Sequence, residues 1–292
     1  MANGIIVIDK PQDWTSHDVV AKLRGLLRER RIGHAGTLDP MATGVLPVFV
    51  GRATRAVEFA AEAGKEYIAG CKLGVITDTQ DVTGTVLEKR PVTAAREQVE
   101  AAMAQFRGDI LQVPPMYSAL KVEGKKLYEL ARKGKEVERQ PRPIHISAFE
   151  LLDELGEDEY LVRIGCSKGT YVRTLCHDLG QTLGCGGVMS SLRRTKSAGF
   201  TLNDALTLEA VAEAAGRGEA KQLLLPVDAY FRDLPEWRAE EKQMKRIRNG
   251  GEVKCAAGVG RYRVYGPDGG FLMVGEVKNG LMTTVKSFFE VE

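Results

Sequence analysis

Several polar residues of the types used in acid–base and nucleophilic chemistry stand inside apolar, glycine-punctuated stretches of the chain. They are Asp39 in "GTLDP", Tyr67 in "KEYIAG", and Tyr171 with Arg173 in "GTYVRT". A carboxylate beside an arginine is held ionised because the opposite charge lowers its pKa, and an ionised carboxylate can act as a nucleophile or a base. These residue types therefore make an active site built on a carboxylate one interpretation of the sequence.

Each of these residues also has a purely structural interpretation. Asp39 stands before Pro40, which is the pattern of a helix N-cap followed by proline at the first helical position. Tyr67 and Tyr171 can be core rings with a satisfied hydroxyl, and Arg173 can be a solvated helix residue. Residue types and spacing alone leave an α/β enzyme or an RNA-binding protein whose reaction is open.

Several common catalytic and cofactor-binding motifs do not occur in the 292 residues. There is no GxxxxGK[ST] phosphate loop, no GxGxxG after a strand and no GxSxG nucleophile elbow. The four histidines lie far apart without HExxH spacing, and the five cysteines form no CxxC pair, so a metal site has little support. We expect a protein that needs neither a cofactor nor a metal.

The charge pattern is more informative than the net charge of +2, because nucleic-acid binding depends on where basic residues cluster. Basic side chains gather in residues 22–31, 193–196 and 242–254. The N-terminal apolar run is too short for a signal peptide or a membrane span. Together with cysteines that show no pairing pattern, this favours a soluble, cytoplasmic protein.

Strands and helices alternate along the part of the chain that must position the polar residues. The patterns predict a strand over residues 4–10 and an amphipathic helix over 15–31 with a Thr or Ser cap. They further predict strands in "EYIAGCKLG" and "TGTVLEKR", a helix capped from Thr93, and a strand, glycine turn and helix in "EYLVRIGCSKGTYVRTLCHDLGQTLG".

Two other parts of the chain differ in character. Residues 121–142 carry eight basic and four acidic side chains, more charge than a core-facing hairpin tolerates. We expect an exposed arm or long loop there, and a solvated face is the alternative. From about Arg232, short strands are separated by "NGG", "PDGG" and "KNG" turns, which predicts a small β-barrel or sandwich.

The motifs, taken in order, resemble one known family. "GHAGTLDPMATGVLP" is similar to the signature of the bacterial, stand-alone TruB-type tRNA pseudouridine-55 synthases. "KPQDWTSHDVV", "KEYIAGCKLGVITDTQDVTG", "CSKGTYVRTLCHDLG" and "SLRRTKSAGF" resemble further family motifs, and "VPPMYSALKVEGKKLYELARKGKEVERQPRPI" resembles its RNA-gripping thumb. Asp13 departs from the pattern, which usually has glycine there. Because Asp tolerates a left-handed backbone, we expect the turn to persist.

The resemblance implies an α/β (α+β) fold, with a core built on a mixed, largely antiparallel sheet and flanking helices. It implies a catalytic domain over residues 1–231, which carries the arm at about 113–145. A small C-terminal PUA-like β-domain that binds tRNA would follow over residues 232–292.

The resemblance also implies isomerisation of uridine 55 in the tRNA T-loop to pseudouridine, without a cofactor. The base would be flipped out, Asp39 would initiate cleavage of the glycosidic bond, and the uracil would rotate and rejoin through C5. Arg173 would pair with Asp39 and keep it ionised, and Tyr67 would be a candidate for removing the C5 proton. Substrate-binding side chains are implied at His34, Tyr67, Tyr171 and Leu192.

The implied partner is the tRNA T-arm, with no guide RNA, no membrane and no obligate protein partner. A guide-RNA-dependent synthase of the dyskerin type is an alternative, against which the long arm argues. A non-catalytic module that binds or folds tRNA is another. Such a module has no need for Asp39, Tyr67 and Arg173 all to match a catalytic set.

Overall fold

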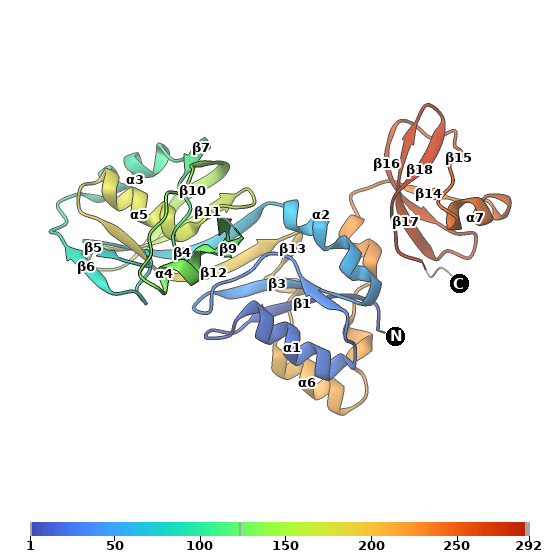
Figure 1. Ribbon diagram of the computed structural model, residues 1–292, viewed down its shortest axis with the longest axis horizontal. Helices are drawn as coiled ribbons and strands as arrows, with labels where there is room; N and C mark the ends of the chain where they lie inside the picture. The colour runs from blue at the N-terminus through green and yellow to red at the C-terminus, as the bar shows by residue number, and fades with distance from the viewer. Residues whose placement is uncertain (1, 123, 290–292) are drawn as a thin grey trace.

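One large sheet forms the centre of the molecule, and the computed structural model describes residues 2–122 and 124–289. The strands of this sheet are β1 (Gly4–Lys10), β2 (Ile32–His34), β3 (Thr43–Val50), β4 (Lys65–Leu73), β7 (Gly108–Gln112), β10 (Arg142–Gly156), β11 (Glu159–Cys166), β12 (Gly187–Ser197) and β13 (Phe200–Thr201). Within the described residues the order is β1-β3-β12-β4-β11-β10-β7, with β2 beside β3 and β13 beside β12 (Figure 1). Among the described strands of this sheet, only β3 and β12 pair in parallel, so the predicted mixed, largely antiparallel sheet is confirmed.

Helices cover the two halves of this sheet separately. Helices α1 (Ser16–Leu27) and α6 (Leu208–Gly216) pack against β1 and β3, whose other face meets the 3-10 helix η1 (Gly51–Ala56) and α2 (Val57–Glu62). Helices α3 (Arg96–Ala104) and α5 (Val172–Thr182) pack against β4, β10 and β11 (Figure 1). Strand β12 joins the two halves, because it pairs with β3 on one side and β4 on the other.

The local signals for α1 are confirmed and those for α3 are not. Thr15 caps α1 as its sequence predicts, and the Asp18 side chain accepts the Thr15 N–H in return at 2.9 Å. The helix ends at Leu27 and not at the predicted Arg31, because Arg28 takes the left-handed conformation. The predicted cap at Thr93 is wrong: α3 begins at Arg96, and the Gln98 side chain accepts the Ala95 N–H at 2.8 Å. A glutamine that reaches back to the main chain replaces the hydroxyl cap.

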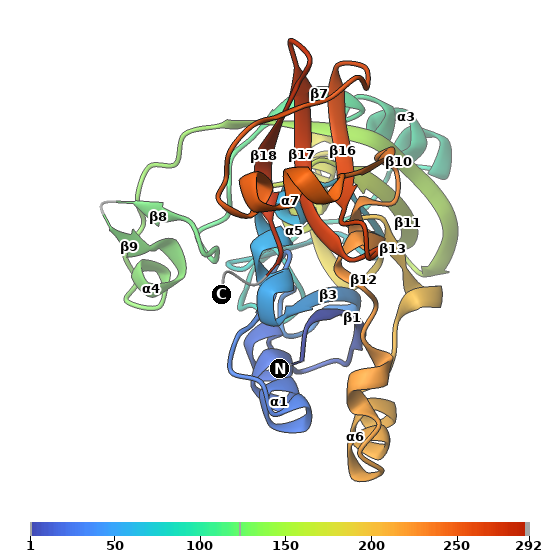
Figure 2. The same cartoon turned by 90° about the vertical axis from the view of Figure 1, so that its right-hand side faces the viewer.

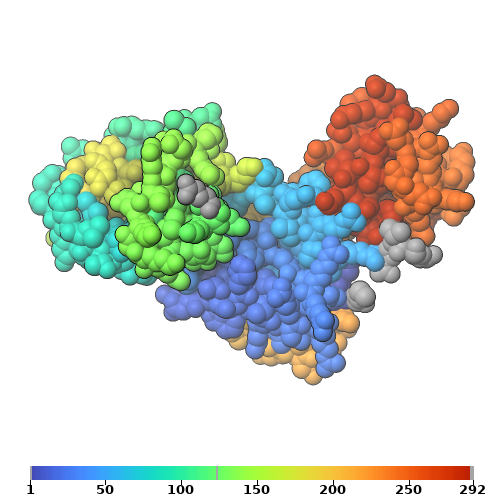
Figure 3. All heavy atoms as spheres, in the orientation of Figure 1, coloured from blue at the N-terminus to red at the C-terminus, as the bar shows by residue number. Residues whose placement is uncertain are grey.

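The predicted exposed arm is present between β7 and β10. It contains the short strands β8 (Lys121–Val122) and β9 (Lys125–Lys126) and the helix α4 (Leu127–Ala131). Figure 2 shows these elements standing away from the body of the molecule, and Figure 3 shows the arm, in green, at the surface beside the N-terminal segments. Leu127 is buried within the arm, whereas its lysines Lys121 and Lys125 are exposed. The arm therefore presents its basic side chains to solvent.

A second sheet follows the large one and fits a PUA-like domain. Its strands are β14 (Glu236–Arg238), β16 (Gly260–Tyr265), β17 (Phe271–Lys278), β18 (Leu281–Ser287) and β15 (Val253–Lys254), in that spatial order, with α7 (Glu241–Arg248) against β15. Its Phe271 and Phe288 contact Phe231 of the preceding 3-10 helix η4 (Val227–Phe231), with ring centroids 6.2 and 5.7 Å away.

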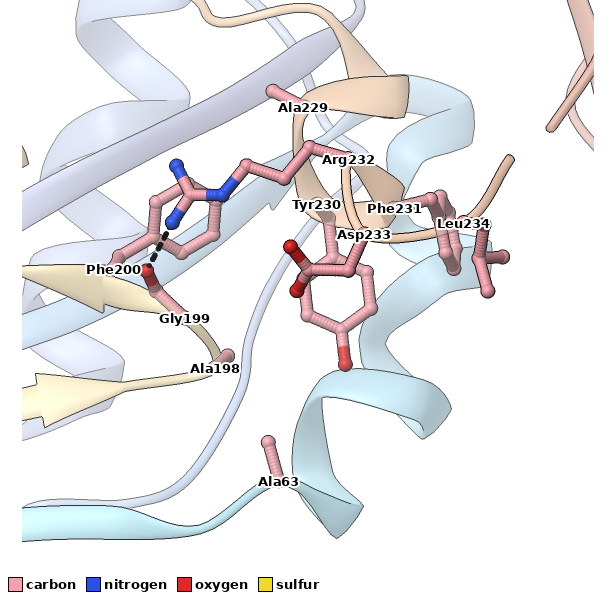
Figure 4. A pocket seen from close by; sticks show the side chains of 10 residues that line it. All are labelled: Ala63, Ala198, Gly199, Phe200, Ala229, Tyr230, Phe231, Arg232, Asp233 and Leu234. Carbon is pink, nitrogen blue, oxygen red and sulfur yellow. Dashed lines mark hydrogen bonds between the residues drawn. The ribbon is translucent and has the colours of Figure 1, made fainter. Parts of the chain in front are cut away.

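A pocket of about 280 Å³ lies next to this aromatic contact (Figure 4). Residues 198–200 and 229–234 line it together with Ala63, and Arg232 donates a hydrogen bond to the Gly199 carbonyl at 2.7 Å. None of the site residues predicted from sequence is among the lining residues. The predicted residues Tyr67 and Leu192 lie instead on β4 and β12, where the two halves of the large sheet meet.

Candidate active site

The loop that carries Asp39 runs from β2 to β3 and does not start a helix. The Ala42 N–H donates to the Asp39 carbonyl at 3.0 Å, and β3 begins at Thr43. Gly44, with φ of +101°, lies so close to β12 that a Cβ there would stand 2.3 Å from the Arg194 carbonyl oxygen. Because this parallel pairing draws the chain into β3, the helix-cap interpretation of Asp39 is wrong.

The Asp39 carboxylate points to Arg173, as the functional interpretation requires. Arg173 lies in the first turn of α5, and its Nε is 3.1 Å from Asp39 Oδ2. The Arg173 side chain is 8% exposed and the Asp39 side chain 41% exposed. Residues 134 positions apart thus form an ion pair whose acidic member remains open to solvent and to a substrate.

Arg173 is held from three further directions. Its Nη1 lies 3.6 Å from Asp81 Oδ2 and donates to the Thr79 carbonyl at 3.2 Å. Its Nη2 donates to the Tyr117 carbonyl at 2.8 Å, at the base of the arm. The guanidinium fork therefore fixes the Asp39 ion pair to a loop on one side and to the arm on the other.

Asp81 is a site residue that the sequence reasoning did not single out. It lies in the "TDTQDVTG" loop between β5 (Val75–Thr77) and β6 (Val86–Lys89) and is buried. Its carboxylate accepts hydrogen bonds from the Thr79 hydroxyl at 2.8 Å and from the Thr83 N–H and hydroxyl at 3.0 and 2.6 Å. The sequence signal that could have indicated Asp81 is a carboxylate flanked by threonines, whose hydroxyls can donate hydrogen bonds to a buried charge.

Tyr67 and Leu192 lie on two paired strands, in a buried cluster that also contains Leu38 of the Asp39 loop. Tyr67 lies on β4 and Leu192 on β12, and both belong to the same buried cluster as Leu38. Burial raises the pKa of the Tyr67 phenol, and the charge of nearby Arg194 opposes that rise. The predicted tyrosine thus lies in an apolar setting with one cation beside it.

Tyr171 occupies the residue before α5, next to Arg173. Its main chain is fixed to the end of β7, because its N–H donates to Gln112 Oε1 at 2.8 Å and its carbonyl accepts from Gln112 Nε2 at 3.0 Å. Burial raises the pKa of its phenol. The same pair of hydrogen bonds orients the start of α5, and therefore helps to position Arg173.

His34 ends β2, five residues before Asp39. Its ring meets the edge of the His17 ring of α1, with centroids 5.5 Å apart. Its Nδ1 is buried without a hydrogen-bond partner among the described residues, and burial lowers its pKa to about 4. His34 is therefore a neutral, planar side chain near pH 7.

Lys10 was not predicted as a site residue, yet it ties the N-terminal motif to the Asp39 loop. It is fully buried, and its Nζ donates to the carbonyls of Pro11, Trp14 and Pro40 at 2.9, 2.5 and 3.2 Å. Asp13 adds a hydrogen bond from its N–H to the Pro40 carbonyl at 2.8 Å, with φ of +64°. The left-handed turn therefore persists with Asp in the place of glycine, as expected.

We predict that Lys10→Met destabilises the fold and changes its pH dependence. The loss leaves carbonyls without their donor, which costs about 1–3 kcal/mol. Burial lowers the pKa of Lys10 to about 8, from an ordinary 10.5. Between these values the unfolded chain binds a proton that the folded chain has released, so Lys10 makes stability rise with pH. Urea unfolding of both proteins from pH 7 to 10 measures this; equal slopes against pH would contradict the assignment.

The basic run 193–196 is not wholly a surface cluster, contrary to its sequence interpretation. Arg193 is exposed and pairs with Asp9 at 2.7 Å. Arg194 is fully buried, and donates to the Val45 carbonyl at 2.7 Å and to the Gly36 carbonyl at 3.0 Å. Strand alternation sends adjacent side chains to opposite faces, so only part of the run can meet a phosphate.

The other sequence expectations concern cysteines, metals and membranes. All five cysteines are free and buried. Among the described residues, no cluster of three or more His, Cys, Asp or Glu side chains could hold a metal ion. Within residues 2–122 and 124–289, no helix is long and apolar enough to cross a membrane.

Comparison of the sequence with family models gives two adjoining matches that together span residues 24–232. The N-terminal domain model of the TruB family pseudouridylate synthases matches residues 24–172. The model of the tRNA pseudouridylate synthase B C-terminal domain matches residues 173–232. Every site residue described above except Lys10 and its neighbours in the N-terminal motif lies within these matches.

Individual proteins are similar over most of their length. The tRNA pseudouridine synthase B of Stutzerimonas stutzeri is 46% identical over 280 residues, which cover 94% of this chain and 92% of that protein. That of Streptococcus thermophilus is 48% identical over 252 residues, covering 85% and 86%. Among solved structures, a Cbf5–Nop10–Gar1 complex is 27% identical with a TM-score of 0.75, covering 99% of this chain and 85% of that one.

A second solved structure, an H/ACA ribonucleoprotein bound to a substrate RNA containing 2′-deoxyuridine, is 24% identical with a TM-score of 0.74. It covers 99% of this chain and 86% of that one, and shows the same fold. The family matches and the relatives confirm the resemblance drawn from the motifs and the expectation of an isomerase. The chain belongs to the TruB family of pseudouridylate synthases.

Proposed function

We propose that this protein converts uridine 55 in the T-loop of tRNA into pseudouridine. The observation that carries the proposal is the ion pair between Asp39 and the buried Arg173. The relatives named tRNA pseudouridine synthase B support tRNA as the substrate. Incubation with tRNA labelled with tritium at uridine C5 tests it, since label must leave when C5 bonds to the ribose. A tRNA with cytidine at position 55 should release none.

The chemistry follows from the positions of the side chains. The uridine leaves the base stack, at a cost of a few kcal/mol, so that its glycosidic bond can reach Asp39. The half-exposed carboxylate initiates cleavage of the N1–C1′ bond, while Arg173 orients it and balances its charge. The uracil turns, C5 bonds to C1′, the C5 proton leaves to Tyr67 and N1 gains a proton. Water and cofactor are not consumed.

The side chains around Asp39 receive the flipped base. Tyr67 contacts the uracil ring, and Tyr171 and Leu192 line the same space, which their apolar surroundings favour. His34 fills the gap that the extruded nucleotide leaves, since a neutral ring is suited to stacking against bases. These roles are proposals that rest on the clustering of the residues around Asp39.

We further propose that residues 1–231 form the catalytic domain and residues 232–292 a tRNA-binding domain. The basic segments 22–31 and 242–254 meet phosphates of the tRNA, and the arm at about 113–145 closes over the T-loop. The arm, and the similarity to proteins named tRNA pseudouridine synthase B, support action without a guide RNA or an obligate protein partner. Because Arg173 donates a hydrogen bond to the Tyr117 carbonyl, a movement of the arm would change the position of the Arg173 guanidinium beside Asp39.

Neutralising the arm should weaken tRNA binding and its dependence on salt. In Lys125→Gln/Lys126→Gln/Lys133→Gln, each lost phosphate contact lowers the slope of log K against log salt by roughly 0.7–0.9. Filter binding at 50–300 mM salt measures the slope. The control variant Arg217→Gln/Lys221→Gln removes two exposed charges outside the arm, and its salt slope should equal that of the wild type. An unchanged slope in the arm variant would contradict the proposed phosphate contacts and favour the alternative that these lysines form a solvated face.

A further inference from the structure

Arg194 is a buried cation that forms no direct ion pair with an acidic side chain among the described residues. Its side chain is fully buried on β12, and the hydrogen bonds it makes go to the neutral carbonyls of Val45 and Gly36. Its Nη1 is buried and has no hydrogen-bond partner within the described residues. Burying a charge without a direct ion pair is costly, so a fold that retains one invites a functional explanation.

The side chain that Arg194 faces across the sheet is Tyr67. The two residues are directly paired in the antiparallel register of β12 and β4, so their side chains emerge on the same face. Both are buried, with Tyr67 at 7% exposure. The pairing brings a cation that forms no direct ion pair among the described residues next to a largely buried phenol.

Arg194 also touches the loop of Asp39. Gly36, at φ of +81°, gives its carbonyl to Nη2, and a Cβ at that position would stand 3.3 Å from Nη1. Glycine therefore leaves the space that Nη1 occupies. A single guanidinium thus joins the loop that presents the carboxylate to the strand that presents the tyrosine.

We propose that Arg194 is a positioning residue that holds Tyr67 and supplies the positive charge facing its oxygen while Tyr67 takes the C5 proton. This inference rests on the proposed function, in which Tyr67 is the base. The Tyr67 phenol first gives its proton to solvent, and the phenolate oxygen then bonds the C5 proton. The C5–H electron pair forms the C5=C6 double bond, the N1=C6 pair moves to N1, and N1 takes up a proton from solvent. One proton leaves carbon and one is gained by nitrogen, so no co-reactant is needed.

The charges around Tyr67 support this role of Arg194. Burial raises the pKa of Tyr67, and Cys166 of β11 and Asp39 act in the same direction. Arg194 is the cation that opposes them at this phenol. Its charge is also felt by other neighbours, whose pKa values burial lowers first and Arg194 lowers further: Lys10, His34 and Lys65. Removing it should therefore move Tyr67 away from its ionised form.

The test compares Arg194→Met, which removes the charge, with Arg194→Lys, which keeps it, in single-turnover tritium release from pH 6 to 10. The interaction of a buried charge with a reacting group corresponds to about 10- to 100-fold in rate. We expect Arg194→Met to lose that factor and to shift the rising limb of the pH–rate profile to higher pH. Arg194→Lys should restore the position of the limb, with tRNA affinity unchanged in both. Arg217→Met, an exposed arginine far from the site, should behave as wild type.

Combination with Tyr67→Phe separates this inference from the proposed function. If Arg194 acts through Tyr67, adding Arg194→Met or Arg194→Lys to Tyr67→Phe should change the residual rate by less than about threefold. Full additivity, or equal losses in both Arg194 variants with an unmoved pH limb, would overturn it and leave Arg194 a structural residue. A wild-type rate in Tyr67→Phe would instead remove Tyr67 as the base. Should Arg194→Met fail to fold, Arg194→Lys and its double variant carry the test.

Discussion

Asp39→Asn should abolish pseudouridine formation while tRNA binding is retained. The asparagine keeps the shape of the side chain but cannot attack or accept a proton as a carboxylate does, and losing a group of this kind costs at least about 10³- to 10⁴-fold in rate. The ion pair to Arg173 at 3.1 Å is lost as well. Because the Asp39 side chain is 41% exposed, the change leaves no deeply buried gap, and the fold should survive.

Tritium release from C5-labelled tRNA measures the rate, and filter binding measures affinity with the same preparation. Asp109→Asn serves as the control, since this exposed carboxylate pairs with His145 on the edge of the sheet outside the proposed site. It should release label at the wild-type rate. If Asp39→Asn did so too, the mechanism built on Asp39 would be wrong, whatever its tRNA affinity.

Local sequence signals predicted those strands and helices that are determined by residues within or next to the element itself. Strand β1 follows from a β-branched run that ends before Pro11, and the start of α1 follows from the amphipathic pattern and the cap at Thr15. The interpretation of Asp39 as a helix cap used signals of the same kind and was wrong. What decides there is the parallel pairing of β3 with β12, which joins residues about 150 positions apart and leaves no trace in the loop itself.

The burial of Arg194 could not be predicted from local sequence signals either. Within "RRTK" it is one of several basic residues, and a basic run is typical of a solvated face. Its burial depends on β12 lying between β3 and β4, a placement that only the assembled sheet specifies. Asp81 and Lys10 could not be predicted as site residues for a related reason. The role of a single charged residue depends on the carbonyls and hydroxyls that surround it in the folded chain. The family motifs could indicate Asp39, Tyr67 and Arg173, but not the groups that hold them.

Arg173→Lys should cost about two orders of magnitude or more in rate, although the positive charge is kept. Arg173 uses its whole fork: Nε toward Asp39, Nη1 toward Asp81 and Thr79, and Nη2 toward the Tyr117 carbonyl. A lysine offers one nitrogen and can replace only part of this set, and hydrogen bonds of charged groups are worth about 1.5–3 kcal/mol each. Single-turnover tritium release should therefore fall while filter binding of tRNA stays near wild type.

Arg173→Met provides the comparison, because it removes the charge altogether. Asp81 would then be a buried carboxylate without its cation, and breaking a buried pair in this way costs about 3–5 kcal/mol. We expect a fall in the thermal midpoint for Arg173→Met and a much smaller one for Arg173→Lys, with both slow in catalysis. A wild-type rate in Arg173→Lys would show that charge alone suffices, and that the fork joining loop, arm and carboxylate is structural. Loss of rate without loss of stability in the lysine variant places the function in the geometry of the fork itself.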